Sequence, residues 1–520
     1  MNMTVLDRAR WARLSVERRA FAIEDVLQLA FVACCGVAVG AFVVAAVFRL
    51  GYPFPFEATE PASLEQVARV LRGQALYVAP TLQHVPMIYG PVYFYASAAL
   101  ASVMGVTLAP LRLVSLLASC GTLILVGWLV KRETGRWIGG VAAVGLLAIA
   151  YPLTQTAYDT ARVDALFVFC LVAAIVLART RTDVAGLLAS GALVGLAGLT
   201  KVPIGAAPVA GALGLYLLVS ARARVLLYAV ACLGVLALGL VALRLQSGPW
   251  PTWYMLDLPS KHVINNHADL LGRFWFLDTL PRFALPLLIG PVFLLLRAVD
   301  GDRRPLLFYG LVSLSLVAVA WAARSNSGGG QNVLVPSYVL VALFFGLGLD
   351  RLLRLLGSSS TRVRALRAYV LGLCVLELAL NAYNPRLLVP YRSEQWAAER
   401  LASTLVGLDG PLFALNLDGY VLGSDKGEQP LTGAVLELTG SFGGPGTDVG
   451  NQWKADFASA LRQRRFSHVV LIEDCCEIHN ALAENGYVAA GPLFPPGDDY
   501  WLWTSGLTPA DIQVYVPSSN

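Results

Sequence analysis

The stretch that sets the architecture is FAIEDVLQLAFVACCGVAVGAFVVAAVFRL (Phe21–Leu50), which is followed at once by GYPFPFEATE (Gly51–Glu60). The apolar run is longer than the about 20 residues that a helix needs to cross a bilayer. It also exceeds the about 7–15 residues of a signal-peptide core, and it lacks a clear small-x-small cleavage site. The run therefore predicts an anchored first membrane span with two glutamates just beyond its end.

The composition indicates that most of the chain faces lipid. Of the 520 residues, 57% are hydrophobic and 14% are charged, and the mean hydropathy is +0.63. A soluble protein typically carries about 25% charged residues, so too little polar surface is present to cover a water-soluble globule. The net charge of +5 reflects Arg-rich loops. No basic stretch is interleaved with aromatic residues in a polar domain, which argues against nucleic acid as a partner.

Apolar segments recur along residues 1–384 and predict a mainly α, polytopic membrane domain. They lie at about 21–50, 92–108, 110–130, 138–157, 163–178, 184–200, 203–220, 225–243, 281–296, 305–322, 333–349 and 368–383. Three consecutive segments, 92–108, 110–130 and 138–157, lie between the loop 51–91 and Arg162. Both of these are expected on the outer side, so only two of the three segments can cross the membrane fully. We expect the shortest, 92–108, to be partly interfacial, which leaves about eleven crossings.

The arginines predict how these spans are oriented, because cytoplasmic loops carry an excess of Lys and Arg. Short Arg-rich connections occur at Arg179–Arg181, Arg222–Arg224, Arg297–Arg304 and Arg351–Arg367. The connections between them are then extracytoplasmic: 51–91, Asp159–Asp164, the surroundings of Lys201, 245–280 and Ser325–Asn332. We therefore expect a multi-pass protein of the cytoplasmic (inner) membrane with a cytoplasmic N-terminus.

After Asn384-Pro385 the composition becomes like that of a soluble protein, and residues 385–520 predict a small extracytoplasmic α/β domain. Short β-like runs alternate there with helix-like runs. The β-like runs are Pro411–Leu415, His468–Ile472, Tyr487–Ala490 and Tyr500–Trp503, and the helix-like runs are Glu394–Leu405, Trp453–Arg464 and Ile478–Asn485.

The first candidate for chemistry is the outer loop 51–91. Glu57 and Glu60 are three residues apart, so one helical turn would place them on one face. A part-buried carboxylate at a membrane boundary has a raised pKa that suits a general base. The alternatives are two solvated loop acids, or an acid that caps the helix expected near Ala62. Tyr89 belongs to an aromatic stretch that also fits an interfacial belt.

Two further candidates lie where predicted spans begin or end. Arg162 and Asp164 sit at the start of one span, where charges are rare and usually paired, and Arg162 can pair with Asp164 or with Glu60. Arg162 would hold a phosphate and Asp164 would orient it, unless the pair is only a structural salt bridge. Lys201 ends another span, where a lysine either snorkels to the interface or binds a lipid phosphate.

The fourth candidate is RSNSGGGQNVLVPSY (Arg324–Tyr338), a glycine-rich turn with Arg324, Gln331 and Asn332 as hydrogen-bond donors. Its backbone amides can approach a ligand closely, although a flexible turn is the simpler interpretation. The outer loop 245–280 adds Lys261 as a further phosphate or sugar ligand. His262 and His267 in that loop lack a third ligand, so a metal site is the less favoured reading.

In their order along the chain, these motifs resemble the membrane-embedded GT-C glycosyltransferases, which include protein O-mannosyltransferases and the aminoarabinose transferases of lipid A. The resemblance covers about residues 1–384. It rests on Glu57/Glu60 followed by V-x-R-x-L-x-G-Q-x-L-Y (Val67–Tyr77), I-Y-G-P-x-Y-F-Y (Ile88–Tyr95), A-R-V-D (Ala161–Asp164), L-T-K (Leu199–Lys201) and G-G-G-Q-N-V-L-V-P (Gly328–Pro336).

The resemblance implies sugar transfer from a polyprenyl-phosphate-linked donor, with an acid of the first outer loop as the base and no catalytic metal or other cofactor, although a divalent cation is not excluded. The family usually has Asp-Glu where this chain has Glu-Ala-Thr-Glu, and Glu60 lies nearer than Glu57 to the position of the family's acid. The acceptor hydroxyl would belong to an envelope glycan, a lipid or a protein. A transporter or flippase of a lipid-linked sugar is the alternative, but charges near the midplane and a repeat between halves are not seen.

Overall fold

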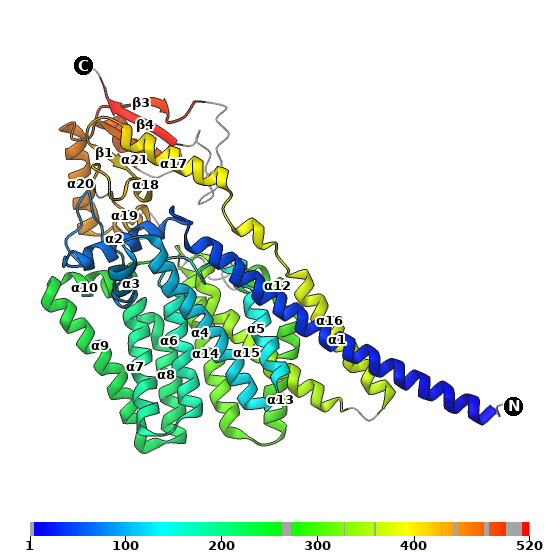
Figure 1. Ribbon diagram of the computed structural model, residues 1–520. Helices are drawn as coiled ribbons and strands as arrows, with labels where there is room; N and C mark the ends of the chain where they lie inside the picture. Colours follow the sequence, from blue (N-terminus) through cyan, green and yellow to red (C-terminus); the bar gives the residue numbers. More distant parts are fainter. Residues whose placement is uncertain are drawn as a thin grey trace.

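The computed structural model describes residues 5–262, 272–326, 328–357, 360–415, 417–427, 429–440, 446–472, 478–495 and 512–518, without the side chains of 5–22, 223, 432 and 472. The candidate strand Tyr500–Trp503 and the residue His267 lie outside these ranges. Figure 1 shows a bundle of long helices that carries a small mixed α/β domain at one end. The predicted fold class, a helical membrane protein with a small C-terminal sheet, is confirmed.

The bundle is built from apolar helices of different lengths. They are α1 (Val5–Leu50), α4 (Leu108–Thr134), α5 (Trp137–Ile149), α6 (Asp164–Thr180), α7 (Val184–Thr200), α8 (Pro203–Ser220), α9 (Val225–Ser247), α12 (Leu280–Ile289), α13 (Pro291–Val299), α14 (Arg303–Ser325), α15 (Val335–Leu355) and α16 (Thr361–Leu380). Within the described residues, 7 stretches are long and apolar enough to cross a membrane. The expected total of about eleven crossings stays a prediction.

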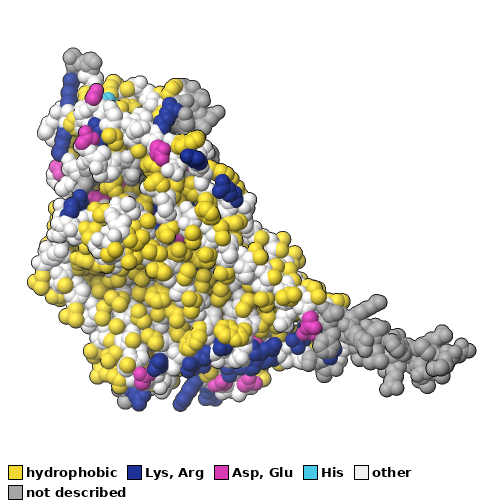
Figure 2. Space-filling view, in the orientation of Figure 1, with side chains coloured by type: hydrophobic (Ala, Val, Ile, Leu, Met, Phe, Trp, Pro, Cys, Tyr) yellow, Lys and Arg dark blue, Asp and Glu magenta, His cyan; other side chains and the backbone are white. Residues whose placement is uncertain are grey.

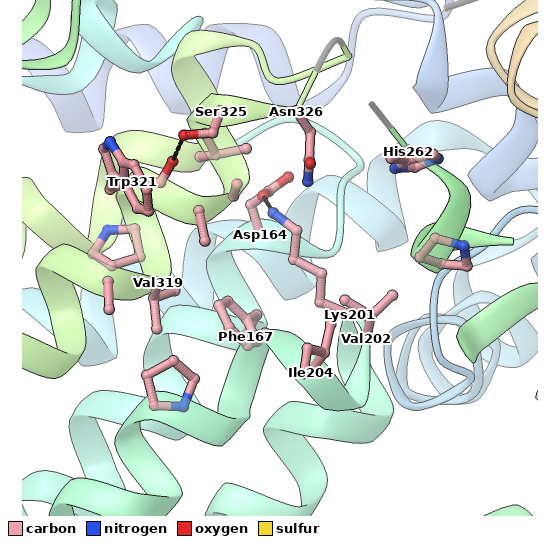
Figure 3. A pocket seen from close by; sticks show the side chains of 18 of the residues that line it. Asp164, Phe167, Lys201, Val202, Ile204, His262, Val319, Trp321, Ser325 and Asn326 are labelled. Carbon is pink, nitrogen blue, oxygen red and sulfur yellow. Dashed lines mark hydrogen bonds and ion pairs between the residues drawn. The ribbon is translucent and has the colours of Figure 1, made fainter. Parts of the chain in front are cut away.

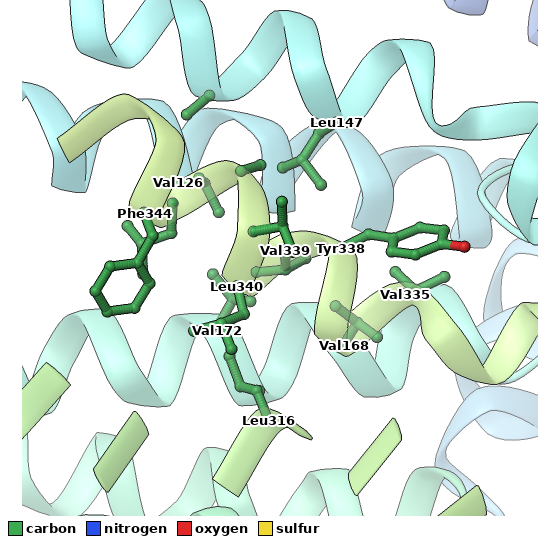
Figure 4. Close-up of a cluster of buried hydrophobic side chains, with 14 of the residues drawn as sticks. Val126, Leu147, Val168, Val172, Leu316, Val335, Tyr338, Val339, Leu340 and Phe344 are labelled. Carbon is green, nitrogen blue, oxygen red and sulfur yellow. The ribbon is translucent and has the colours of Figure 1, made fainter. Parts of the chain in front are cut away.

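Helix α15 forms the centre of the bundle, because its whole 18-residue apolar window is buried inside the protein. It packs against α4, α5, α12, α13 and α14. Figure 4 shows its side chains Val335, Tyr338, Val339, Leu340 and Phe344 among apolar side chains of the neighbouring helices. A helix that is apolar all round needs apolar surroundings, from lipid or from other helices, and other helices provide them here.

The two ends of the bundle differ in charge. In Figure 2 a band of Lys and Arg side chains marks the end away from the C-terminal domain. The connections α6–α7, α8–α9, α13–α14 and α15–α16 lie at that end in Figure 1, and they include the Arg-rich connections of the sequence. Where the structure describes them, the connections that the sequence predicts as outer lie at the opposite end in Figure 1. Which side of the membrane each end faces stays a prediction.

At the end that carries the C-terminal domain, two short helices cover the bundle. Helix α2 (Thr59–Leu71) packs against α3 (Val92–Met104), and α3 packs in turn against α4. With 13 residues, α3 is about 20 Å long, which is less than the about 30 Å of a bilayer core. This position beside α2 fits the expected interfacial role of segment 92–108.

The C-terminal domain is a four-stranded mixed sheet with helices. The strand order is β1 (Leu412–Ala414), β2 (His468–Ile472), β4 (Ile512–Pro517) and β3 (Tyr487–Pro492), with β1 parallel to β2 and the other pairs antiparallel. The helices include α17 (Arg392–Gly407), α18 (Asp418–Val421), α19 (Thr432–Thr439), α20 (Asp448–Arg462) and α21 (Ile478–Glu484). Three strands and three helices coincide with sequence predictions, whereas β4 was not predicted.

This domain is anchored on the first loop. Trp453 of α20 donates its indole N–H to the carbonyl oxygen of Thr81 at 2.9 Å. Leu438 and Phe457 belong to the same buried apolar cluster as Val67 of α2. The domain therefore braces the loop that carries Glu57 and Glu60.

Gly90 sets the distance between the first loop and the end of α7. Its N–H donates to the carbonyl oxygen of Lys201 at 2.7 Å. A Cβ atom at this position would lie 2.0 Å from the carbonyl oxygen of Leu199. Only glycine allows the two backbones to approach this closely.

We expect Gly90→Ala to destabilise the protein by about 1–3 kcal/mol, because the clash is with backbone that cannot rotate away. Thermal unfolding of the purified protein in detergent measures the effect. Gly40→Ala on α1 is the matched control, since no atom lies within 4 Å of the added Cβ. Equal unfolding temperatures for the two variants would show that this close approach is unimportant.

Candidate active site

Glu60 is held by a complete set of donors. Arg112 of α4 donates to both of its carboxylate oxygens, from Nε at 2.9 Å and from Nη2 at 2.7 Å. The backbone N–H groups of Phe56 and Ala161 add bonds of 2.6 and 2.7 Å. Glu60 is 0% exposed and Arg112 is 1% exposed. This glutamate therefore joins α2, α4 and the loop before α6.

The N–H donors of the Arg112 side chain are also all used. Its remaining donors reach the carbonyl oxygens of Arg49 (3.0 Å), Tyr52 (2.6 Å) and Phe54 (2.7 Å). An arginine has five N–H donors, and all five are used here. Burial alone would raise the pKa of Glu60, but the Arg112 guanidinium and the two backbone donors bring that pKa below its ordinary value. Glu60 is thus a weak base with no free lone pair, so the geometry does not support the sequence-based preference for Glu60 over Glu57.

Glu57 begins a chain of alternating charges at the same end of the bundle. Arg162 donates from Nη1 to Glu57 at 2.9 Å and from Nε to Asp164 at 3.2 Å. Lys201 donates from Nζ to the other oxygen of Asp164 at 2.6 Å. The predicted Arg162–Asp164 pair is present, and the second partner of Arg162 is Glu57 rather than Glu60. Asp164 orients both cations, as expected for a carboxylate at the start of a span.

The environment of Glu57 suits a base better than that of Glu60. Its side chain is 22% exposed, and the hydroxyl of Thr59 donates to it. Burial raises the pKa of Glu57 above its ordinary value, because Arg162 and Thr59 offset only part of the desolvation. Tyr89 is half-buried and lies within electrostatic reach of Glu57, Arg162 and Asp164.

An apolar cavity of about 480 Å³ opens beside this chain of charges. Figure 3 shows Lys201 and Asp164 at its polar end, with Phe167, Ile204 and Val319 along the walls. The lining residues come from α6, α8, α14, η6 (Gln331–Leu334) and the segment before His262. Among the predicted ligands, Asn332 lines the cavity and hydrogen-bonds Asp164.

Five other predicted ligands are not among the residues that line this cavity: Arg162, Tyr89, Arg324, Lys261 and Gln331. Arg324 is buried and donates to Asp278 at 2.8 Å and to the carbonyl oxygen of Gly329, so it fixes the glycine-rich turn instead. A Cβ at Gly329 would lie 2.3 Å from the carbonyl oxygen of Ala323, so the turn is tightly packed. Lys261 and Gln331 are exposed and are not among the residues that line the cavity.

Sequence reasoning missed two buried arginines. Arg112 holds Glu60, and Arg49 donates to Asp159 at 2.7 Å and to Thr156 at 2.9 Å. Both lie in apolar segments, where a single charge is costly and needs a partner. A single arginine in an apolar segment is the sequence signal that would have identified both residues. That signal does not indicate which carboxylate pairs with each arginine. Among the described residues, no group of three or more His, Cys, Asp or Glu side chains could hold a metal ion.

Comparisons with known proteins show which family and which solved structures the chain resembles. Residues 85–245 match the family described as dolichyl-phosphate-mannose-protein mannosyltransferase. ArnT from Cupriavidus metallidurans bound to undecaprenyl phosphate is similar in structure, with a TM-score of 0.55 at 14% identity over 93% of this chain and 97% of that chain. Its apo form gives a TM-score of 0.57 at 15% identity over the same shares. The chain has the GT-C fold.

The archaeal oligosaccharyltransferase from Archaeoglobus fulgidus also shares this GT-C fold, with a TM-score of 0.54 at 12% identity over 86% of this chain and 71% of that chain. No curated protein matches the chain by sequence. The resemblance to GT-C enzymes that the sequence motifs indicate is therefore confirmed.

We expect Glu60→Gln to destabilise the GT-C domain by about 3–5 kcal/mol, because it leaves the Arg112 charge buried without a counter-ion. The readout is the thermal unfolding temperature of the purified protein. The matched control is Glu484→Gln at the exposed end of α21. A folded Glu60→Gln variant with an unchanged unfolding temperature would contradict the structural role assigned to this glutamate.

Proposed function

We propose that the protein is a glycosyltransferase that transfers a sugar from a polyprenyl-phosphate-linked donor to an acceptor hydroxyl at the outer face of the cytoplasmic membrane. One observation carries this proposal: the ion-paired chain Glu57–Arg162–Asp164–Lys201 ends in Asp164 and Lys201, which line an apolar cavity among the apolar helices α6, α8 and α14. A lipid-linked phosphate needs cations for its head and an apolar wall for its tail. The GT-C fold supports the same class of reaction.

The geometry favours Glu57 as the base. It would take the proton of the acceptor hydroxyl as the hydroxyl oxygen attacks the anomeric carbon. The bond from that carbon to the phosphate oxygen breaks, and its electron pair leaves with the phosphate. Lys201 and Arg162 would balance the added charge. A single displacement of this kind inverts the anomeric centre.

The proposal also covers the orientation of the protein in the membrane and the acceptor of the sugar. The Arg-rich end faces the cytoplasm by the positive-inside rule, so the C-terminal domain and the candidate site face outward. The acceptor would be an envelope glycan, lipid or protein that reaches Glu57 from the side of the C-terminal domain. The proposed chemistry requires no cofactor.

We expect Glu57→Gln to lower sugar transfer by about 10²–10⁴-fold with the fold intact, because the amide cannot accept the hydroxyl proton. The assay incubates purified protein with undecaprenyl phosphates that carry labelled sugars and with membranes from a deletion strain as the acceptor source. Glu484→Gln is again the control. Full transfer by Glu57→Gln would reject the assignment, and a wild-type protein that consumes none of the donors would reject the enzyme in favour of a transporter.

The pH dependence tests the same residue. The carboxylate is the active form, and the pKa of Glu57 lies above the ordinary 4.5. Transfer should therefore be lost as the pH falls through this raised pKa, at a higher pH than an exposed glutamate would give. The residual activity of Glu57→Gln should lack this acid limb. An identical limb in both proteins would assign it to another group.

A further inference from the structure

His262 is a cavity residue that the proposed chemistry leaves unused. It follows the short helix η4 (Pro259–Lys261) and lines the same cavity as Lys201 and Asp164. In the view of Figure 3 its ring lies across the cavity from Trp321, with Lys201 and Asp164 between them. The histidine therefore lines the same cavity as the cation proposed for the donor phosphate.

The ring of His262 has unused hydrogen-bonding capacity. Its Nε2 atom is buried and has no hydrogen-bond partner among the residues that the structure describes. A buried polar group without a partner costs folding free energy, so such a group in a native site calls for an explanation. A bound ligand in the adjoining cavity would provide one.

The hydroxyl groups around this cavity are already engaged. Ser325 donates to the carbonyl oxygen of Trp321 at 2.7 Å, and Ser260 donates to that of Asp257 at 2.7 Å. The Nε1 atom of Trp321 is also buried without a partner in the described part of the chain. Trp321 belongs to the membrane-spanning helix α14, however, and its indole does not titrate, so the two residues can be told apart by pH.

The charges that face His262 are balanced. Lys201 and Asp164 form an ion pair on the opposite elements, Asp257 and Lys261 flank His262 on its own segment, and α14 contributes only uncharged side chains to the cavity. Burial lowers the pKa of His262, so its imidazole is neutral at neutral pH. A neutral ring can donate an N–H bond to an anion without adding a charge to the free site.

We propose that His262 binds an oxygen of the donor's phosphate beside Lys201, and that it takes up a proton when this phosphate carries its second charge. The inference rests on the proposed function. The phosphodiester of the donor has one negative charge, whereas the polyprenyl phosphate that leaves has up to two. A nearby second charge favours the imidazolium over the neutral ring. The proton comes from hydronium in the solvent: an O–H bond of hydronium breaks, an N–H bond of the ring forms, and a water molecule is released.

The test is the affinity of the full-length protein in lipid nanodiscs for undecaprenyl phosphate, measured from about pH 6 to about pH 8. We expect His262→Ala to weaken binding about tenfold at neutral pH, as for the loss of a hydrogen bond to a charged group. His262→Gln keeps an N–H donor and should recover most of this loss. His468→Gln, at the start of β2, is the matched control and should bind like the wild type.

The pH profile separates binding from a structural role. Wild-type affinity should rise as the pH falls, because the ligand-bound imidazole gains a proton that the free one lacks. His262→Gln should lose this part of the rise. The lipid phosphate also titrates, at about pH 6, but it does so equally for both proteins. Their difference therefore reports His262 alone.

The outcomes distinguish the two proposals. Suppose that the wild type binds undecaprenyl phosphate. The role of His262 is then rejected, and the proposed function stands, if His262→Ala binds equally well. Parallel pH profiles of the wild type and His262→Gln have the same consequence. If the wild type binds undecaprenyl phosphate no better than undecaprenol, both fall. Should His262→Ala fail to fold, the comparison of the wild type with His262→Gln still decides the question.

Discussion

The arrangement of the site depends on the buried ion pair between Arg112 and Glu60. A guanidinium inside an apolar helix costs several kcal/mol unless a carboxylate and other acceptors surround it. The chain meets this requirement by folding the segment after α1 back onto α4, so that three backbone carbonyl groups and Glu60 enclose Arg112. The loop that carries Glu57 is thereby placed at the end of the bundle and held rigid.

The Arg112–Glu60 pair also determines the surroundings of Glu57. Glu60 also accepts the N–H of Ala161, which ties the loop to the residue beside Arg162. Arg162 is therefore within reach of Glu57, and Asp164 joins Arg162 to Lys201. Two carboxylates and two cations balance one another, so the free site holds its charges without a ligand. Under the proposed function, a phosphate that arrives from the lipid side would share cations that are already oriented.

The C-terminal domain contributes to the same rigidity. Its helices α19 and α20 share a buried apolar cluster with α2 and the first loop, and Trp453 bonds to the backbone of Thr81. Gly90 fixes the other side of this loop against the end of α7. The loop is thus supported from the bundle below and from the domain above. This double support keeps Glu57, Arg162 and Lys201, which come from three different segments, in one place.

The sequence by itself determined the membrane character and the small C-terminal α/β domain, and it singled out Glu57, Arg162, Asp164 and Lys201, which the structure joins by ion pairs. It also singled out Arg324, Lys261 and Gln331, which the structure places elsewhere. What the sequence determined follows from local composition, because the length of an apolar run and the position of an arginine need no knowledge of neighbours. Only the tertiary structure decided that Glu60 pairs with Arg112, that Arg162 reaches Glu57, and that Arg324 turns to Asp278. Which carboxylate is saturated and which is available depends on partners tens of residues away, and the spacing of residues along one chain does not encode such contacts.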